Sequence, residues 1–342
     1  MTTPDEKQRL LVKQIRQIAV DKLDISDYSR TALRRVVSAA AFYMDIYRSS
    51  LEHVLACGNK APIEMTLVDY GGGHGLLSIL AKKLGFGRVV YVDYNADAVQ
   101  TVGVLGGMLG AEPDVVLQGD ATVLEAWCRN NGVTPDALLA MDVIEHIYVL
   151  DDFFAVLHAM SPKMTMLFTT ASTPFNQRVV RRLHKAMLRD EYGGANKEGF
   201  LSMRRGYVKQ MHPDMSDREL DYWAENTRGL VFDDVRRAVE SQSPNLLLDA
   251  YNTCDPRSGS WTERILPISD YQQLLAAYGY GLLVLPGFYN EYRRGPKEWA
   301  SRHYNRIIRR APQQAPEGWR QRRRMKRALS KAPFIFLIAN PE

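Results

Sequence analysis

The sequence predicts an α/β fold with a mostly parallel seven-stranded sheet, N-terminal helices and a mainly helical insertion. Three observations predict it. Apolar, partly β-branched runs alternate with amphipathic runs from 63 to 170, which is typical of βαβ units with right-handed crossovers. A glycine-rich turn at 71–75 joins the first apolar run to the first amphipathic one. Two more apolar runs, 281–286 and 333–339, complete the seven strands.

The composition indicates an ordinary folded protein. Of the 342 residues, 46% are hydrophobic and 24% charged, and the formal net charge is +5. The three cysteines (Cys57, Cys128 and Cys254) are far apart, odd in number and without a CxxC pair, which argues against a disulfide framework or a zinc site. The N-terminus lacks the apolar core of a signal peptide, and no apolar run approaches the roughly 20 residues that span a bilayer. We therefore expect a soluble, cytoplasmic protein.

The first 60 residues are predicted to form an N-terminal helical cap. From Leu33 to Leu55, apolar residues recur at three- and four-residue steps, which predicts one apolar face of a long helix. From the periodicity alone, we expect this helix to pack on the sheet domain.

The sheet domain is expected to comprise 61–170 and 263–342, with the regions between and within these ranges as insertions. Its first strands are predicted at 65–70, 88–93, 114–118, 136–141 and 164–169, with helices at 75–84, 96–109, 121–130 and 150–160. The first of these helices is expected to stop at Gly85, because glycine readily adopts the left-handed conformation that ends helices. A later helix is predicted over 268–278, with Ser269 as its N-cap and Gly279 as its stop.

The region 171–262 is too long to be an ordinary connecting loop. Its amphipathic stretches predict helices, including one over 217–227 with Ser216 as a cap. We expect a substrate-recognition lid. The polar segment 252–264 could be a binding loop or an ordinary surface loop.

A basic helical insert is predicted over 290–331. From 293 to 331 there are fourteen Lys or Arg residues and two Glu residues. This segment could be a solvated helical face, or it could contact a polyanionic, lipid-linked or membrane-surface partner, or a nucleic acid.

The glycine-rich turn distinguishes between nucleotide types. A dinucleotide fingerprint Gly-x-Gly-x-x-Gly that starts at Gly71 requires glycine at position 76, which is leucine. The pattern Asp69-x-Gly71-x-Gly73-x-Gly75 is complete instead. It resembles the first motif of the class I S-adenosylmethionine (SAM) dependent methyltransferases. The resemblance implies a Rossmann-like sheet, SAM as the cofactor, and contacts to its amino-acid end from this loop and from Asp69.

Acids at the ends of the next strands extend the resemblance. Asp93 follows the second strand, Asp120-Ala121 the third, and Asp-Val-Ile-Glu-His begins at Asp142 after the fourth. The resemblance implies that Asp93 binds the ribose hydroxyls and Asp120 the adenine amino group, with Ala121 leaving room for the ring. It also places Tyr94 and Asp142 among the cofactor-binding residues. Each acid could instead only cap the helix that follows it. In the family resembled, N-terminal helices often cap the cofactor and help to form the substrate pocket, and Tyr43, Tyr47 and Arg48 could serve there.

Two candidate catalytic residues lie in the Asp-Val-Ile-Glu-His motif. A hydroxyl group that accepts a methyl group needs a base or a metal to remove its proton. His146 and Glu145 are the candidates for the base. Both could instead cap the next helix or contact the cofactor. Asp142, Glu145 and His146 also resemble the metal-binding set of some O-methyltransferases, although Asp stands where those families have Glu. In that alternative the three residues would bind a divalent metal, and His184 or His212 would be a further ligand.

We therefore predict a SAM-dependent methyltransferase that acts on a hydroxyl of a small molecule or glycan. The resemblance covers roughly 63–170 and 265–340. Two alternatives stay open: an RNA 2′-O-methyltransferase, indicated by the basic segment, and a SAM-binding protein without its own catalysis.

Overall fold

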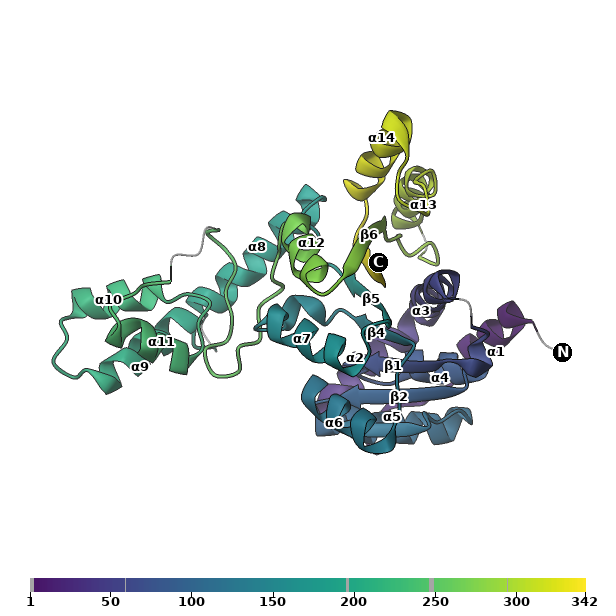
Figure 1. The fold of residues 1–342 in the computed structure, drawn as a ribbon, viewed down its shortest axis with the longest axis horizontal. Helices are drawn as coiled ribbons and strands as arrows, with labels where there is room; N and C mark the ends of the chain where they lie inside the picture. The colour runs from purple at the N-terminus through teal and green to yellow at the C-terminus, as the bar shows by residue number, and fades with distance from the viewer. Residues whose placement is uncertain (1–2, 59, 195–196, 246–248, 294) are drawn as a thin grey trace.

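A computed structural model describes residues 3–58, 60–194, 197–245, 249–293 and 295–342. Its centre is a seven-stranded sheet of order β3-β2-β1-β4-β5-β7-β6 (Figure 1). The strands are β1 (Thr66–Tyr70), β2 (Arg88–Asp93), β3 (Val115–Gln118), β4 (Ala137–Met141), β5 (Thr165–Thr170), β6 (Tyr280–Pro286) and β7 (Ile335–Pro341). Strands β1 to β5 are parallel, and β7 runs antiparallel to both β5 and β6. This is the class I methyltransferase arrangement of the Rossmann-like fold, as predicted.

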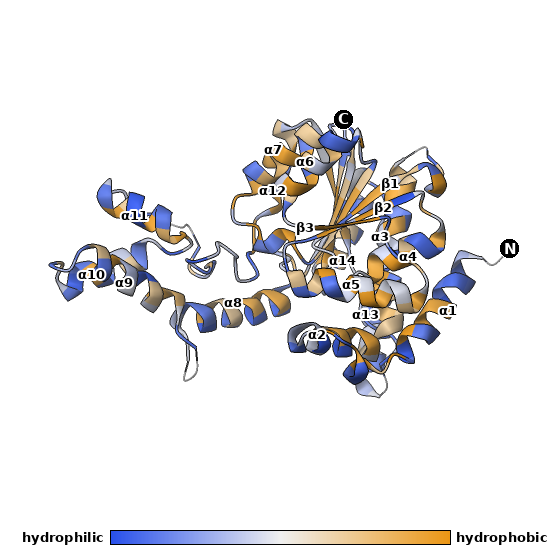
Figure 2. Ribbon diagram, turned by 90° about the horizontal axis from the view of Figure 1, so that it is seen from below, coloured by the Kyte–Doolittle hydropathy of each residue, from blue (hydrophilic) through white to orange (hydrophobic). Residues whose placement is uncertain are grey.

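Helices cover both faces of the sheet (Figure 2). On one face lie α3 (Ala40–Cys57), α4 (Leu76–Leu84) and α5 (Ala96–Leu109), and on the other α6 (Ala121–Asn131), α7 (Leu150–Met160) and α12 (Ile268–Ala277). Strands buried on both faces are expected to be almost continuously apolar, and the central residues of β2 and all of β4 fit this description. The predicted strands and helices of the sheet domain agree with the observed ones to within two residues.

The N-terminal region contains α1 (Pro4–Arg16), α2 (Asp27–Ser38) and α3, so the prediction of one long helix over 33–55 is wrong. The break lies at Ala39, which has φ −127° and ψ 28°. Helix α2 packs on α5, whereas α3 packs on α4 and β5. One straight helix could not reach both surfaces, so the apolar periodicity continues through a change of direction.

The insertion consists of α8 (Gln177–Tyr192), α9 (Phe200–Met211), α10 (Asp217–Asn226) and α11 (Phe232–Glu240), and it extends away from the sheet (Figure 1). It has its own apolar cluster: Val208, Leu220, Trp223, Val235 and Val239. The predicted cap at Ser216 is confirmed, since its hydroxyl and the Glu219 carboxylate form a capping box.

A buried ion pair also holds the insertion together. Arg204 on α9 is fully buried and lies 2.5 Å from the Glu191 carboxylate on α8. The Thr253 hydroxyl donates to the same carboxylate at 2.6 Å, and the Arg204 Nε–H donates to the Ala224 carbonyl at 2.9 Å. Four segments of the insertion therefore meet at one charge pair.

The C-terminal part differs from the prediction at one cap. Helix α12 begins at Ile268, with Pro267 at the N-cap and no side-chain cap, so the assignment of Ser269 as N-cap is wrong. Pro267 has φ −56°, a value compatible with the start of a helix, so the N-cap lies two residues before Ser269. The Ser269 hydroxyl instead donates to Asp270. The basic connection between β6 and β7 contains α13 (Pro296–Ile308) and α14 (Gly318–Leu329).

Over the described ranges, no helix combines the length and apolar character needed to cross a membrane. Cys57 is an exposed free thiol, and Cys128 and Cys254 are buried free thiols.

Candidate active site

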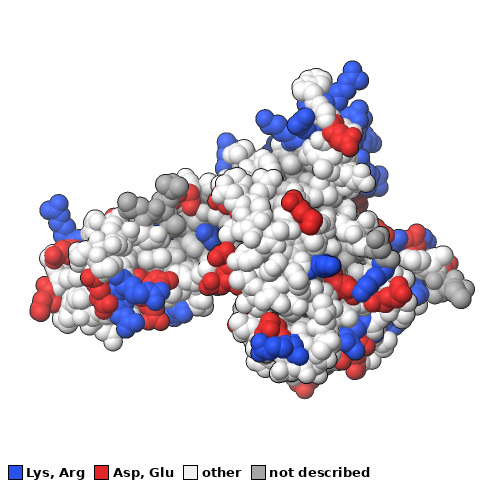
Figure 3. Space-filling model, viewed as in Figure 1, with Lys and Arg blue, Asp and Glu red and all other residues white. Residues whose placement is uncertain are grey.

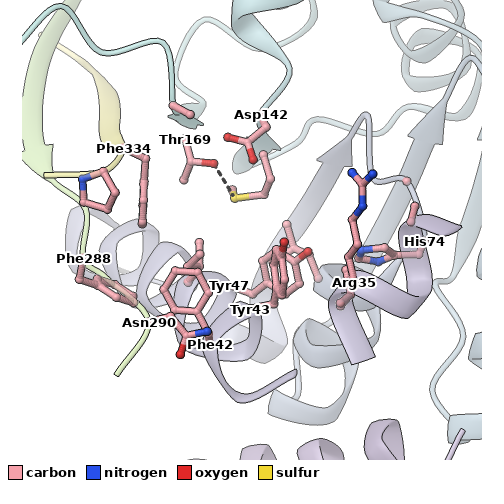
Figure 4. A pocket seen from close by; sticks show the side chains of 18 of the residues that line it. Arg35, Phe42, Tyr43, Tyr47, His74, Asp142, Thr169, Phe288, Asn290 and Phe334 are labelled. Atoms are coloured by element: carbon pink, nitrogen blue, oxygen red, sulfur yellow. Dashed lines mark hydrogen bonds between the residues drawn. The ribbon is translucent and has the colours of Figure 1, made fainter. Parts of the chain in front are cut away.

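A cavity of about 800 Å³ lies at the carboxyl ends of β1 and β4, where open α/β sheets bind ligands. Of the predicted site residues, Asp69, Gly71, Gly73 and Asp142 line it. The remaining walls come from α2, α3, the start and return of the insertion, and the segments that flank β6 and β7. Figure 4 shows this cavity from close by.

The glycines of the turn have different reasons to be glycine. Gly71, Gly73 and Gly75 all have positive φ, between 52° and 73°. A Cβ at Gly71 would lie 2.6 Å from the Val143 side chain, and one at Gly75 would lie 2.1 Å from Val102. In front of Gly73 there is open space. Gly73 therefore presents bare backbone to the cavity, whereas Gly71 and Gly75 allow close packing, and Gly75 itself does not line the cavity.

Asp93 and Tyr91 fasten this loop to β2. The Gly73 N–H donates to Asp93 Oδ2, and the Asn95 N–H donates to Oδ1, both at 2.9 Å. The Tyr91 hydroxyl donates to the Gly73 carbonyl at 2.6 Å. The buried Asp93 carboxylate thus fixes the loop and keeps further lone pairs for a ligand.

Asp69 is buried beneath the loop. It accepts hydrogen bonds from the Ser78 N–H at 3.0 Å and the Ser78 hydroxyl at 2.7 Å. Burial raises its pKa to about 6, against the opposing effect of the Ser78 hydrogen bonds. This acid therefore joins the end of β1 to the first turn of α4.

The residues predicted for the adenine side lie outside the lining of the cavity. Asp120 is the N-cap of α6, where its Oδ1 accepts from Thr122 and Val123. The Thr122 hydroxyl is the main reason that the pKa of Asp120 is lowered. Ala121 is buried at the start of α6, and Tyr94 is 80% exposed. Their roles in binding adenine and ribose stay predictions.

Asp142 occupies a strained position on the cavity wall. Its φ is +52°, in the left-handed region that few non-glycine residues adopt. The side chain is accessible because it faces the cavity, although protein surrounds that cavity. Removal from bulk water raises its pKa to about 6, the Glu263 carboxylate adds to this, and His146 opposes it.

The two predicted catalytic residues point elsewhere and do not line the cavity. Glu145 is buried and accepts from the Thr170 hydroxyl at 2.7 Å, while its Oε2 has no hydrogen-bond partner among the described residues. Burial, with Asp142 nearby, raises the pKa of Glu145 well above its usual value, which favours the neutral acid. The His146 Nδ1 lies 2.7 Å from the Trp261 carbonyl. Since a carbonyl only accepts, we assign the proton to Nδ1, and Nε2 is then the acceptor.

The structure does not support the metal alternative. Within the described ranges, no group of three or more His, Cys, Asp or Glu side chains is placed to hold a metal ion. Glu145 and His146 are engaged as above, and His184 stacks on Tyr251 in the insertion, with ring centroids 3.6 Å apart. His212 terminates α9.

Several cavity residues were not predicted. Arg35 on α2 lies beside His74 at one end, and Phe288 and Phe334 lie at the other (Figure 4). Burial lowers the pKa of His74 to about 4, so this imidazole is neutral at physiological pH. The cavity therefore has a polar end beside the glycine loop and an aromatic end remote from it.

The three pocket residues suggested for the N-terminal helices divide between two cavities. Tyr43 and Tyr47 line the main cavity, and burial raises the pKa of both phenols. Arg48 lines a neighbouring cavity of about 620 Å³, which shares Phe42 and Phe288 with the first. Arg48 pairs there with Asp5 and Glu52.

The returning end of the insertion is bound to the Asp-Val-Ile-Glu-His motif by backbone hydrogen bonds. The Trp261 N–H donates to the His146 carbonyl and the Arg264 N–H to the Glu145 carbonyl, both at 3.2 Å. Between them, Glu263 has φ +52° and faces the cavity. The polar segment 252–264 is therefore more than a surface loop, because it brings a second carboxylate to within electrostatic reach of Asp142.

Comparison with known families settles the class. The family profile described as a methyltransferase domain matches residues 25–227, which is more than half of the chain. The chain belongs to this family, within the class I SAM-dependent methyltransferases. A search of curated proteins finds no match.

Among solved structures, this methyltransferase is similar to a protein from Listeria monocytogenes that is described as an S-adenosylmethionine-dependent methyltransferase. The two chains are 12% identical, and the TM-score is 0.39 over 86% of this chain and 99% of that one. A SAM-dependent methyltransferase from Agrobacterium tumefaciens is 17% identical, with a TM-score of 0.31 over 38% of this chain and 44% of that one. An RNA methyltransferase from Salinibacter ruber, in complex with S-adenosyl-L-homocysteine, is 18% identical, with a TM-score of 0.29 over 37% and 74%. The chain thus spans less than half of the Agrobacterium protein.

The cavity of this methyltransferase fits SAM at its polar end. The open backbone at Gly73 would face the amino-acid part of the cofactor, and Asp69 lies beneath it. Asp93 does not itself line the cavity, but beside Gly73 it retains lone pairs for hydroxyl donors. The cationic side chain of Arg35 lines the same end and suits a carboxylate.

Proposed function

We propose that this enzyme transfers a methyl group from SAM to a hydroxyl of a small molecule or glycan. The observation that carries the proposal is one cavity of about 800 Å³ that joins the glycine loop to an aromatic end. Its volume falls within the range of about 300–1,000 Å³ that is usual for small-molecule sites. Phe42, Phe288 and Phe334 offer ring faces at the end remote from the loop, which suits an apolar molecule or a sugar ring.

The acceptor hydroxyl must lose its proton during transfer. When bound, SAM supplies a methyl group activated by the positive charge on its sulfur. Asp142 is the carboxylate that reaches the cavity beside the glycine loop, and a pKa near 6 suits a general base at neutral pH. We assign proton acceptance to Asp142. His146, which lowers the pKa of Asp142, is assigned as a positioning residue, and Glu145 holds Thr170 at the base of the site.

The test uses SAM with a ¹³C-labelled methyl group and extracts fractionated by size. We expect label in a low-molecular-weight fraction, with the carbon chemical shift of a methoxy group in NMR spectra. The Asp142→Asn variant should bind SAM and transfer little label. Label on nitrogen or carbon, or only in protein or nucleic acid, would refute the proposal.

The RNA 2′-O-methyltransferase alternative has one observation in its favour, the cationic surface of α14. That surface is distinct from the cavity, so it carries an inference of its own.

A further inference from the structure

We propose that the outward face of α14 binds the phosphate backbone of single-stranded RNA. The residues of this cationic ridge on α14 are Arg320, Arg322, Arg323, Arg324, Lys326 and Arg327. All six are exposed. Figure 3 shows Lys and Arg side chains gathered over α13 and α14, at the end of the molecule opposite α6. This inference does not depend on the acceptor proposed above.

The described residues do not neutralise the charges of the ridge. Arg302 on α13 pairs with Glu298, and Arg309, which follows α13, pairs with Glu291. In the part of the chain that the structure describes, no carboxylate lies within ion-pair distance of the six cations on α14. The nearest aromatic contact is Arg323 over the Trp319 ring, at 5.6 Å.

The arrangement is unfavourable for the isolated helix. Arg320 lies one turn from Arg323 and Arg324, and Arg323 lies one turn from Lys326 and Arg327. Like charges at these spacings destabilise a helix, as do cations near its N-terminus. A bound polyanion would remove both penalties, whereas water and salt only screen them.

The shape of the ridge favours a nucleic acid over a membrane. The apolar face of α14 is Met325, Ala328 and Leu329, and it is buried against the protein. A helix that lies in a membrane surface needs such a face for the lipid. At 3.6 residues per turn, the cations occupy more than half of the circumference, of which a flat bilayer would meet only one side. A flexible phosphate chain can follow the whole arc.

Residue type supports the same partner. Five of the six cations are arginines, whose planar guanidinium groups bind phosphate through two hydrogen bonds. Trp319 on α14 is 68% exposed, and Trp299 on α13 is 74% exposed. Exposed aromatic rings beside cations are suited to stack on unpaired bases.

The test is fluorescence anisotropy with a labelled single-stranded RNA of mixed sequence and the full-length protein. The variant Arg322→Gln, Arg323→Gln, Arg324→Gln should bind at least about tenfold more weakly. Its slope of log affinity against log salt should be smaller by about 2, at roughly 0.7 for each lost phosphate contact. The control Arg218→Gln, Arg236→Gln, Arg237→Gln removes the same charge from exposed positions of the insertion and should bind like the wild type.

Two further measurements separate the possible outcomes. Because like charges are removed, the ridge variant should unfold at the same temperature as the wild type or a higher one, which excludes misfolding as the cause. Equal loss in the ridge and control variants would overturn the proposal, since it would indicate a net-charge effect only. Ridge-dependent binding to anionic phosphatidylserine vesicles without ridge-dependent binding to RNA would also overturn it.

Discussion

The two ends of the cavity are built in different ways. The polar end is built mainly on one continuous stretch, 69–93, in which Asp93 and Tyr91 hold the Gly73 backbone, and α2 adds Arg35. The aromatic and acidic walls come from segments far apart in the chain, including α2, α3, Glu263 and Phe334. A cofactor site of the first kind depends on local hydrogen bonds, whereas an acceptor site of the second kind depends on how distant parts pack. The two ends should therefore be separable by mutation.

The largest effect is expected from Arg204→Ala, which leaves the buried Glu191 carboxylate without its cation. Breaking a buried pair in this way costs about 3–5 kcal/mol, so the insertion should lose its structure in urea before the sheet domain does. Tryptophan fluorescence follows this, because Trp223 and Trp261 lie in the insertion. SAM affinity should change little.

The matched control is the neighbouring Arg205→Ala. Arg205 pairs with Asp217 and Asp221 at the surface, and such pairs contribute at most about 1 kcal/mol. An equal loss of stability in both variants would show that the buried pair does not hold the insertion.

The next effect is expected from Asp93→Ala at the cofactor end. The variant loses the acceptors for the Gly73 and Asn95 amides as well as the expected ribose contact. We expect SAM affinity to fall about 100-fold, equivalent to about 2.7 kcal/mol, in isothermal titration calorimetry. Asp97→Ala, in the first turn of α5, is the control and should bind SAM normally. Wild-type affinity in Asp93→Ala would contradict the cofactor assignment.

Glu263→Gln tests the acceptor end. Its carboxylate raises the pKa of Asp142, so removing that charge lowers this pKa. If Asp142 accepts the proton, wild-type kcat should fall as the pH drops below about 6, and in the variant this fall should occur at lower pH. SAM affinity should stay within about threefold, which is about 0.7 kcal/mol, because Glu263 lies outside the glycine loop. An unshifted pH profile would remove Glu263 from the electrostatics of the base.

The smallest effect is on stability, in Asp142→Asn. The folded-state pKa of Asp142 is about 6, above the ordinary value of 3.8, so the folded protein binds more protons than the unfolded chain between these pH values. Unfolding free energy from this group therefore falls as pH rises from about 4 to about 6. In the Asp142→Asn variant, this decrease in unfolding free energy with rising pH does not occur. It should have a higher unfolding midpoint near neutral pH, and the difference should vanish below about pH 4. A difference independent of pH would indicate relief of backbone strain instead.

Much of the fold and of the cofactor end could be predicted from the sequence because both depend on local patterns. Strand periodicity, the glycine turn and the acid after each strand are all encoded within short segments, as Asp69 and Gly73 illustrate. The break at Ala39 could not be predicted in this way. Nothing in its own residues ends the helix, and only the different surfaces met by α2 and α3 require it.

Most residues of the acceptor end could not be predicted from the sequence for the same reason. Phe42 and Phe288 belong to no motif, and they meet because α3 and the segment after β6 pack beside one cavity. Glu263 carried a partial signal, since it lay in a segment recognised as a candidate binding loop. The residue of that segment that faces inward is determined by the backbone hydrogen bonds of Trp261 and Arg264 to the motif, which the sequence does not reveal.

The two ends of the insertion lie next to each other. The Ser172 hydroxyl donates to the Glu263 carboxylate at 3.1 Å, although ninety residues separate them in the chain. An excursion that leaves and rejoins the sheet domain at one point places few demands on the sheet itself. The segment between these residues is therefore a natural cassette for protein engineering. Exchanging it for another helical unit with closely spaced ends would offer a route to new acceptors on an unchanged cofactor platform.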